Sequence, residues 1–318
     1  MNFTRSTIAI LALTAATSSF THAQEYPTRP IRIVTATPGG GNDFLARIVA
    51  PAMSAALGQQ VIVDNRTGRL VGGLVARATP DGYTLGVGGG SMQFTPILEP
   101  GDYNMVKDFA PISQLERSPN VLVVHPSLKV STVKEFVALG KTRSSPILYG
   151  TGTSGGSLHV AGEMFMISTG VKMKRVPYKS TGPALIALLG NEVHAVFATA
   201  GGVMTHIRDG KLKALGVTSA KPFSLIPDVP TIASQGVAGY DLDTIGFIVA
   251  PLKTPPHIVK RLNAIVVATM QTADVKARLA GGGSESATST PEALQTMLVD
   301  ADNRMRQLFK QIGLLPSK

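Results

Sequence analysis

Residues 145–165 read Ser145-Pro-Ile-Leu-Tyr-Gly-Thr-Gly-Thr-Ser-Gly-Gly-Ser-Leu-His-Val-Ala-Gly-Glu-Met-Phe165. The apolar run predicts a short strand, the Gly, Thr and Ser residues predict a loop, and the remainder predicts a helix. The same order of strand, Gly-rich loop and helix occurs at residues 31–53. Such repeated units predict an α/β fold with parallel strands and helices on the faces of the sheet.

The loop in this segment fits three kinds of chemistry. Its glycines at positions 150, 152 and 155 match the dinucleotide-binding pattern G-x-G-x-x-G. Gly152, Ser154 and Gly156 match the nucleophile elbow G-x-S-x-G of serine hydrolases. The third interpretation is an anion site, because free amides at a helix start attract negative charge.

A dinucleotide cofactor is disfavoured by the basic residues that come after the loop. The fingerprint requires an acidic residue about 20 positions later to bind the ribose. The corresponding stretch is Lys172-Met-Lys-Arg-Val, which contains only basic charges. We therefore expect no cofactor.

A serine hydrolase with Ser154 as nucleophile stays open as the alternative function. The acid and base could come from Asp209 and His257, and His194 and His206 are also available. Nothing in the sequence marks any of these as a triad member, and no His-Gly-Gly-Gly segment supplies an oxyanion hole.

The anion-site interpretation is supported by a second and a third loop. Thr151, Thr153, Ser154 and Ser157 provide hydroxyl donors without adding charge, which suits reversible binding of a small carboxylate. The matching loop at residues 37–43 precedes a helix for which Asn42 or Asp43 is the predicted N-cap. A further Gly-rich loop, residues 88–91, closes the third predicted strand.

Composition narrows the class of protein further. The 318 residues carry a formal charge of +10 and no Cys, so disulfides and thiolate metal sites are excluded. The basic residues are scattered without aromatic interleaving, which disfavours nucleic acid as a partner. His125, His194 and His206 have no ligand-spaced carboxylates or thiols, so we expect no metal site. An apolar stretch after Arg5, ending in Thr21-His22-Ala23, predicts a signal peptide cleaved after Ala23 and export to the periplasm.

The chain resembles the periplasmic substrate-binding receptors of tripartite tricarboxylate transporters, known as the Bug family. No single segment is diagnostic, but their order and spacing together are specific. The matching segments are Tyr26-Pro-Thr-Arg-Pro-Ile-Arg-Ile-Val, Pro38-Gly-Gly-Gly-Asn-Asp, Leu57-Gly-Gln-Gln-Val-Ile-Val-Asp-Asn-Arg, Pro80-Asp-Gly-Tyr-Thr-Leu, Val106-Lys-Asp-Phe-Ala-Pro-Ile-Ser, Asn120-Val-Leu-Val-Val-His-Pro-Ser, Val176-Pro-Tyr-Lys and Leu225-Ile-Pro-Asp-Val-Pro-Thr-Ile-Ala.

This resemblance implies a two-lobed periplasmic-binding-protein fold of type II-like architecture, each lobe a mixed, mostly parallel sheet flanked by helices. It implies a non-catalytic monomer that closes on a small carboxylate and delivers it to a two-subunit membrane permease. Residues 1–23 would be the signal peptide, 24–123 plus 248–318 the first lobe, and 124–247 the second. The crossover strands would lie at residues 121–124 and 247–250.

The loops and the resemblance together give a predicted ligand site. Its residues are Thr37, Pro38, Gly39, Gly40, Asn42, Asp43, Ser91, Gly152, Thr153, Ser154, Ser157, His159, Tyr178 and Thr199. The sequence departs from the family pattern at Arg69-Leu-Val-Gly-Gly-Leu, at Thr95-Pro96 and at Ala198, where an acidic residue is common. Without that acid, a ligand with a free ammonium group is less expected, and the identity of the carboxylate stays open.

Overall fold

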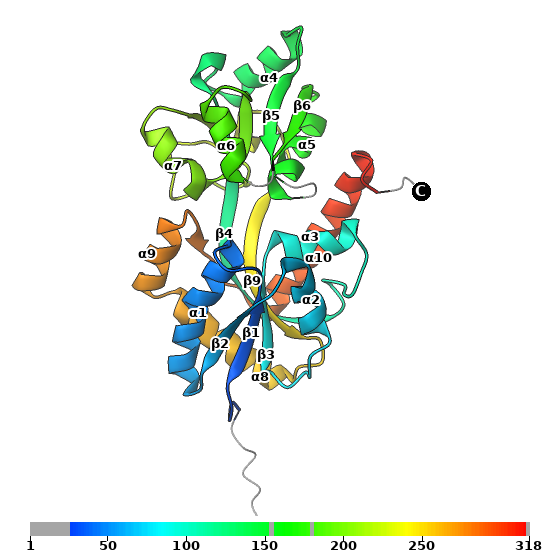
Figure 1. Ribbon diagram of the computed structural model, residues 1–318, viewed down its shortest axis with the longest axis vertical. Coiled ribbons are helices and arrows are strands. Elements are labelled where there is room, and N and C mark those ends of the chain that lie inside the picture. The colour runs from blue at the N-terminus through cyan, green and yellow to red at the C-terminus, as the bar shows by residue number, and fades with distance from the viewer. Residues whose placement is uncertain (1–25, 153–155, 179–180, 316–318) are drawn as a thin grey trace, which may run out of the picture.

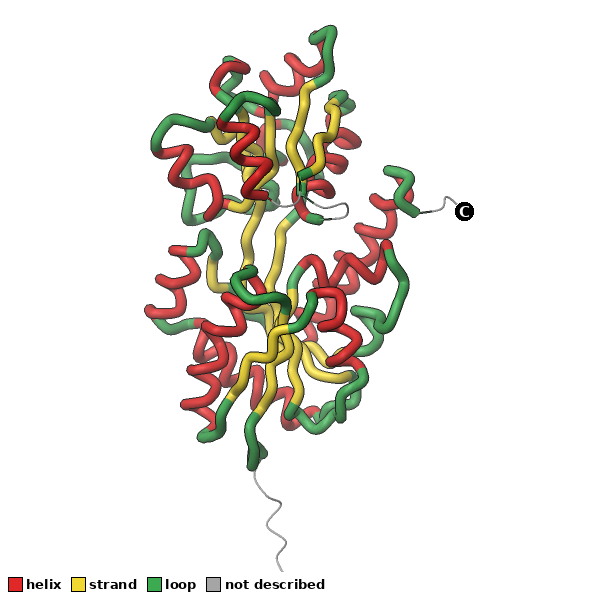
Figure 2. Tube along the Cα trace, in the orientation of Figure 1, coloured by secondary structure: helices red, strands yellow, loops and turns green. Residues whose placement is uncertain are grey.

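The computed structural model describes residues 26–152, 156–178 and 181–315, which form two lobes joined by two long strands (Figures 1 and 2). The first lobe contains β1 (Ile31–Thr35), α1 (Gly41–Leu57), β2 (Val61–Asn65), α2 (Gly68–Ala76), β3 (Thr84–Gly88), α3 (Gly90–Leu98), α8 (Pro256–Met270), α9 (Ala273–Gly281), β10 (Glu285–Ser286) and α10 (Pro291–Gln311). The second contains α4 (Val133–Thr142), β5 (Ile147–Thr151), α5 (Ser157–Thr169), β6 (Met173–Pro177), α6 (Thr181–Leu189), β7 (Ala195–Thr199), α7 (Ala200–Arg208) and β8 (Lys213–Val217).

The joining strands are β4 (Phe109–Val124) and β9 (Asp243–Pro251), which run antiparallel to each other. Residues 109–119 of β4 pair with β9, and residues 120–124 pair with β7 and β8 of the second lobe. β4 runs without a break through Arg117-Ser-Pro, although a proline commonly ends a strand. The strand continues because Pro119 still pairs with Asp243 and the next residue, Asn120, takes up a new partner in β7.

Parallel pairing fixes where the loops lie. In the first lobe β1 lies between β2 and β3, and in the second β5 lies between β6 and β7, all in parallel. The carboxyl ends of parallel strands share one edge of a sheet, so the loops that lead into α1, α3, α5 and α7 gather at two such edges. The predicted two-lobed α/β fold is confirmed, with antiparallel pairing added along β4 and β9.

Apolar side chains fill both faces of each sheet. In the first lobe, one face packs against α1, α8 and α9 through residues such as Leu45 and Leu262. The opposite face packs against α2, α3 and α10, where Met92 and Leu298 are buried. The second lobe has the same two-sided arrangement, so each lobe holds its strand ends on a rigid core.

Helix boundaries show where local sequence signals were insufficient. α1 begins at Gly41 with Gly40 as its N-cap, so the predicted N-caps Asn42 and Asp43 are wrong. The short helices α3, α7 and α9 follow Gly-rich or polar stretches and were not predicted, because nine residues give little periodicity. None of the helices in the described part of the chain is long and apolar enough to cross a membrane.

Candidate functional site

Four helices start at the strand ends that face the region between the lobes: α1 and α3 in the first, α5 and α7 in the second (Figure 1). The N-caps of the first three are Gly40, Gly89 and Gly156, which have no side chain to accept from the first-turn amides. In contrast, threonine side chains cap α4, α9 and α10. The first-turn amides of α1, α3 and α5 therefore donate to no N-cap side chain, and such amides are suitable donors for an anion.

The loop before α1 is held from behind by a buried carboxylate. Asp43 is only 3% exposed, and its oxygens accept from the Gly39 amide at 2.9 Å and from Asn65 Nδ2 at 2.8 Å. Arg47 Nε lies 2.9 Å from the same carboxylate. Burial by itself raises the pKa of Asp43, but the hydrogen bonds from Asn65, Arg47 and Gly39 lower it overall. Asp43 therefore stabilises the loop and stays ionised.

The carbonyls of this loop are also engaged. Asn65 Nδ2 donates to the Ala36 carbonyl at 2.6 Å, and the Gly40 amide donates to the Thr37 carbonyl at 3.4 Å. Gly39 has a φ of +79°, a left-handed conformation that favours glycine. Thr37, Pro38, Gly39 and Gly40 themselves are exposed. The loop presents an accessible surface, and the Ala36 and Thr37 carbonyls are already hydrogen-bonded within the protein.

The start of α3 lies beside this loop. A Cβ on Gly89 would be 3.0 Å from Asn42 Oδ1, so the Asn42 side chain lies directly against the Gly89 backbone. The Thr35 hydroxyl donates to the Val87 carbonyl at 3.1 Å, which ties the two strand ends together. Ser91 is exposed in the first turn of α3. The first lobe thus brings together the predicted residues of the 37–43 loop and Ser91.

The loop after β5 is tied in a similar way. The Tyr178 amide donates to the Thr151 carbonyl at 2.8 Å. Arg175 donates through Nη2 to the Gly152 carbonyl at 3.4 Å and through Nε to the Thr151 hydroxyl at 2.9 Å. Gly152, Ser157 and Tyr178 are half-buried around this loop. Sequence reasoning missed Arg175, although a basic residue inside a strand next to the loop strand was a possible signal.

His159 occupies the buried side of the same loop. It is 4% exposed, and its Nε2 lies 3.4 Å from Glu163, which also accepts from the Tyr149 hydroxyl at 2.6 Å. Burial and then the positive charge of Arg175 lower the pKa of His159, against the opposing effect of Glu163. The ring is therefore neutral at pH 7 and is engaged inside the lobe. Among the described residues no three His, Asp or Glu side chains are grouped to hold a metal ion.

The start of α7 is covered by the first lobe. Its N-cap, Thr199, pairs across the strands with Asn120 and makes no side-chain capping bond within the described residues. A Cβ on Gly201 would be 2.3 Å from the Gly282 carbonyl oxygen, and one on Gly283 would be 2.1 Å from the Gly201 amide nitrogen. These backbones are in direct contact, so the predicted residue Thr199 lies where the two lobes touch.

Two members of the predicted site, Thr153 and Ser154, lie outside the described residues, and so does the proposed nucleophile of the hydrolase alternative. Of its suggested partners, His194 accepts from the Leu148 amide at 2.8 Å through Nδ1. Asp209 forms an ion pair of 3.5 Å with Lys211. Both groups have structural partners of their own.

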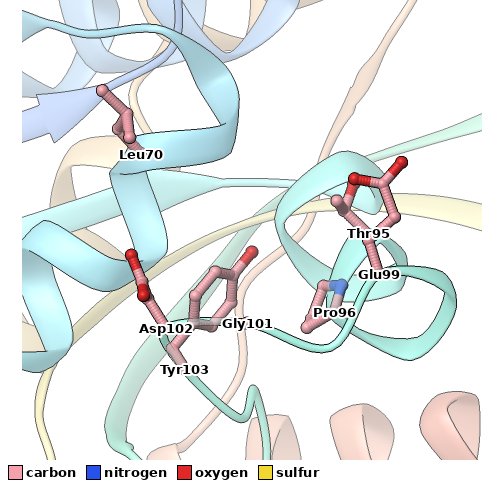
Figure 3. A pocket seen from close by; sticks show the side chains of 7 residues that line it. All are labelled: Leu70, Thr95, Pro96, Glu99, Gly101, Asp102 and Tyr103. Atoms are coloured by element: carbon pink, nitrogen blue, oxygen red, sulfur yellow. The ribbon is translucent and has the colours of Figure 1, made fainter.

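Two cavities of the described structure adjoin α3. One of about 150 Å³ lies between α2, α3 and the turn at residues 99–103, with Leu70, Pro96 and Tyr103 in its wall (Figure 3). That volume is below the range of about 300–1,000 Å³ typical of small-molecule sites. A larger one of about 390 Å³ lies beside α10, with walls from both lobes that include Gln93, Arg117, Asp243 and Arg304.

Two α/β lobes joined by paired strands, with uncapped helix starts facing each other, define the class of two-lobed solute-binding proteins. The family model for the tripartite tricarboxylate transporter family receptor matches residues 45–314. The chain belongs to that family of receptors.

Individual relatives match this chain over most of its length. Protein BugT of Bordetella pertussis is 32% identical, over 98% of this chain and 99% of that protein. Rpa4515 of R. palustris, solved with adipate, is 31% identical with a TM-score of 0.76, over 91% of this chain and 98% of that one.

Two more solved structures extend the comparison. MatC of Rhodopseudomonas palustris, with bound malate, has a TM-score of 0.72 at 27% identity, over 89% of this chain and 99% of that one. A TctC solute-binding protein from Polaromonas, without ligand, has a TM-score of 0.80 at 27% identity. The match covers 90% of this chain and 99% of that one. These findings support the receptor interpretation and not the serine hydrolase.

Proposed function

We propose that this receptor captures a small organic carboxylate between its lobes, at the starts of α1, α3 and α5. The observation that carries the proposal is the set of glycine N-caps at these three helices, whereas threonine side chains cap α4, α9 and α10. An anion at such a helix start gains about 0.3–1 kcal/mol from each helix dipole, in addition to hydrogen bonds from the amides. The adipate and malate bound to the two relatives support a carboxylate as the ligand class.

The proposed binding surface keeps the predicted residues of both lobes but divides them by role. The exposed loop at residues 37–40, Asn42 and Ser91 would contact the ligand from the first lobe, with Gly152, Thr153, Ser154, Ser157 and Tyr178 opposite them. Asp43 and His159 would act from behind, because both are buried and bonded to protein groups. Thr199 would lie at the contact between the lobes.

Lobe closure is proposed to bend β4 and β9. We divide the chain into residues 24–123 plus 248–318 and residues 124–247, as the sequence suggested. The change of pairing partner between Pro119 and Asn120, and the start of β9 at Asp243, support a bend in these strands slightly before the predicted crossovers. Rotation about two strands is a recognised form of hinge motion around a ligand.

Export, oligomeric state and delivery are proposed from family membership. The chain would be exported through a signal peptide cleaved after Ala23, would remain monomeric in the periplasm, and would deliver its ligand to a two-subunit permease. It would catalyse no reaction and need no cofactor. Ester hydrolysis that disappears in Ser154→Ala would contradict the non-catalytic role.

A thermal-shift screen followed by calorimetric titration tests the ligand class. The panel holds adipate, malate, citrate, benzoate and glutamate, with adipamide as the uncharged match to adipate. At 100 times the dissociation constant a ligand stabilises the folded state by about 2.7 kcal/mol, which is easily measured. We expect at least one acid to bind and adipamide not to bind. Absence of any shift across the acids at millimolar concentration would contradict the proposal.

A further inference from the structure

We infer that Asn65 and Arg175 are positioning residues of the ligand site, each holding one loop of the site through a backbone carbonyl and a side chain. The inference rests on the proposed carboxylate function and extends it to residues that do not themselves line the loops. A loop that binds an anion must keep its carbonyl oxygens away from the negative charge, because amide donors and carbonyl acceptors alternate along the backbone.

The two residues lie on equivalent strands of the two lobes, although at different positions along them. Asn65 ends β2, which pairs in parallel with β1, and is in register with Thr35 immediately before the first loop. Arg175 lies in β6, which pairs in parallel with β5, and is in register with Tyr149 two residues before Thr151. In each lobe the strand beside the loop strand therefore supplies the group that reaches the loop.

The bonds they make are similar in kind. Asn65 Nδ2 donates to the Ala36 carbonyl at 2.6 Å and to the Asp43 carboxylate at 2.8 Å. Arg175 donates to the Gly152 carbonyl at 3.4 Å and to the Thr151 hydroxyl at 2.9 Å. Each residue thus holds both a carbonyl and a side chain of the loop that it supports.

Asn65 is neutral and Arg175 is positively charged, so the side chains that hold the two loops differ in charge. The neutral amide of Asn65 lies next to the Asp43 carboxylate, and Arg47 balances that negative charge at 2.9 Å. Arg175 places a guanidinium against the Thr151 hydroxyl and the Gly152 carbonyl. The group that holds the second-lobe loop is therefore a cation, whereas the group that holds the first-lobe loop is a neutral amide.

Three substitutions separate the charge of Arg175 from its hydrogen bonds. R175Q keeps an amide donor without charge, R175K keeps the charge with a different donor geometry, and R175M keeps neither. For the tightest-binding acid of the panel, titration should show R175M weaker by about ten- to a hundredfold, the range for lost hydrogen bonds to charged groups. R175Q and R175K should lie between R175M and the wild type.

Matched variants control for the loss of a positive charge. K174M removes the neighbouring cation on the same strand, whose side chain is exposed, and should leave affinity within about twofold. In the first lobe, N65A should weaken binding, whereas R66M, one residue later with an ion pair to Asp64, should not. Wild-type affinity in R175M or in N65A, with K174M and R66M unchanged, would overturn the inference.

A ligand-free measurement makes the result independent of the ligand screen. Hydrogen exchange of the peptides covering residues 148–152 should be faster in R175M than in K174M, because the ties to Thr151 and Gly152 are lost. Equal exchange in the two variants would refute the positioning role even if no acid of the panel bound. Failure of the wild type to bind any acid, with faster exchange in R175M, would refute the proposed function alone. Should R175M not fold, R175K and R175Q are compared instead, and indistinguishable wild-type affinity and exchange in both would refute the inference.

Discussion

Individual side chains show how the first-lobe loop is built. Asp43 accepts from three groups at once, which explains why an acid can stand in the first turn of a helix proposed to bind an anion. Its charge is neutralised locally by Arg47, because Arg47 Nε lies 2.9 Å from Asp43 Oδ1. The loop therefore gains rigidity without repelling the ligand.

Replacing Asp43 by Ala should lower the free energy of unfolding by about 1–3 kcal/mol, because buried donors lose their acceptor. Ligand affinity should fall as well, since the loop loses its bond to the Gly39 amide. Urea unfolding and titration measure the two effects. Asp274→Ala is the control: Asp274 is 79% exposed and pairs with Arg278 at the same i,i+4 spacing, so it should cost under about 0.5 kcal/mol. Equal stability of the two variants would contradict this role.

Asp243, at the start of the joining strand β9, gives a pH prediction. Burial raises its pKa from 3.8 to about 6, although Arg117 at 3.2 Å acts in the opposite direction. The folded state thus binds this proton more tightly than the unfolded state. The resulting stability is present below about pH 4 and is lost as pH rises through about 6.

Asp243→Asn removes this titration. The variant's unfolding free energy relative to wild type should therefore increase between about pH 4 and pH 7, by roughly 2 kcal/mol. Urea unfolding at several pH values measures the difference. Parallel stability curves for the two proteins would show that Asp243 titrates normally.

Exposed loop positions were easier to select from the sequence than the residues that support the loops. The glycines and hydroxyl residues at 37–43 and 150–157 were recognisable because loop composition is a local signal. Asn65 and Arg175 were not singled out, because their role depends on strand pairing between segments that are distant along the chain. His159 was assigned to the ligand site, but it is buried, and its burial depends on how α5 packs.

Among the helices and strands, the proposed function depends on the helix N-termini. α3 was not predicted, yet it places Ser91 beside the first loop and brings Gly89 against Asn42. Its glycines and internal Pro96 lower helix propensity, so packing against α10 and the sheet must stabilise it. The longer helices α1, α8 and α10 carry apolar spacing over several turns, which is a signal that the sequence alone provides.

An acidic residue at a ligand-facing helix start should have opposite effects on stability and on binding. Ser91→Asp adds a negative charge to the first turn of α3, which should stabilise the helix by about 0.3–1 kcal/mol. The same charge should weaken carboxylate binding about two- to fivefold by competing for the dipole. Thermal melting and titration give the two readouts.

His257→Asp provides the comparison, because His257 is the exposed second residue of α8, as Ser91 is of α3. It should raise stability by a similar amount and leave affinity unchanged. Unchanged affinity in Ser91→Asp, or an equal loss in both variants, would contradict the placement of the ligand at α3.

For the whole molecule, the contact between the lobes is as important as the loops. Gly201 of α7 and Gly283 of the first lobe touch through their backbones, and Glu285 accepts from the Ser224 amide at 2.6 Å across the same junction. Asp241 and Arg304 add an ion pair of 3.3 Å beside α10. The relative position of the lobes is therefore determined by specific contacts as well as by β4 and β9.

Gly201→Ala should change the relative position of the lobes. The added Cβ would lie 2.3 Å from the Gly282 carbonyl oxygen, which is a backbone atom and cannot move alone. We expect a loss of stability of about 1–3 kcal/mol, weaker ligand binding and a changed radius of gyration in X-ray scattering. Gly281→Ala meets nothing within 4 Å and should change none of these quantities. Identical scattering and affinity in the two variants would show that the glycine contact has no mechanical role.

A crystal structure with the tightest-binding acid of the panel would decide whether the ligand is held between the two lobes. We predict carboxylate oxygens within about 3 Å of first-turn amides of α1 and α5, and lobes rotated toward each other about β4 and β9. An acid found instead in the cavity beside α10, or in contact with only one lobe, would contradict the proposed binding mode.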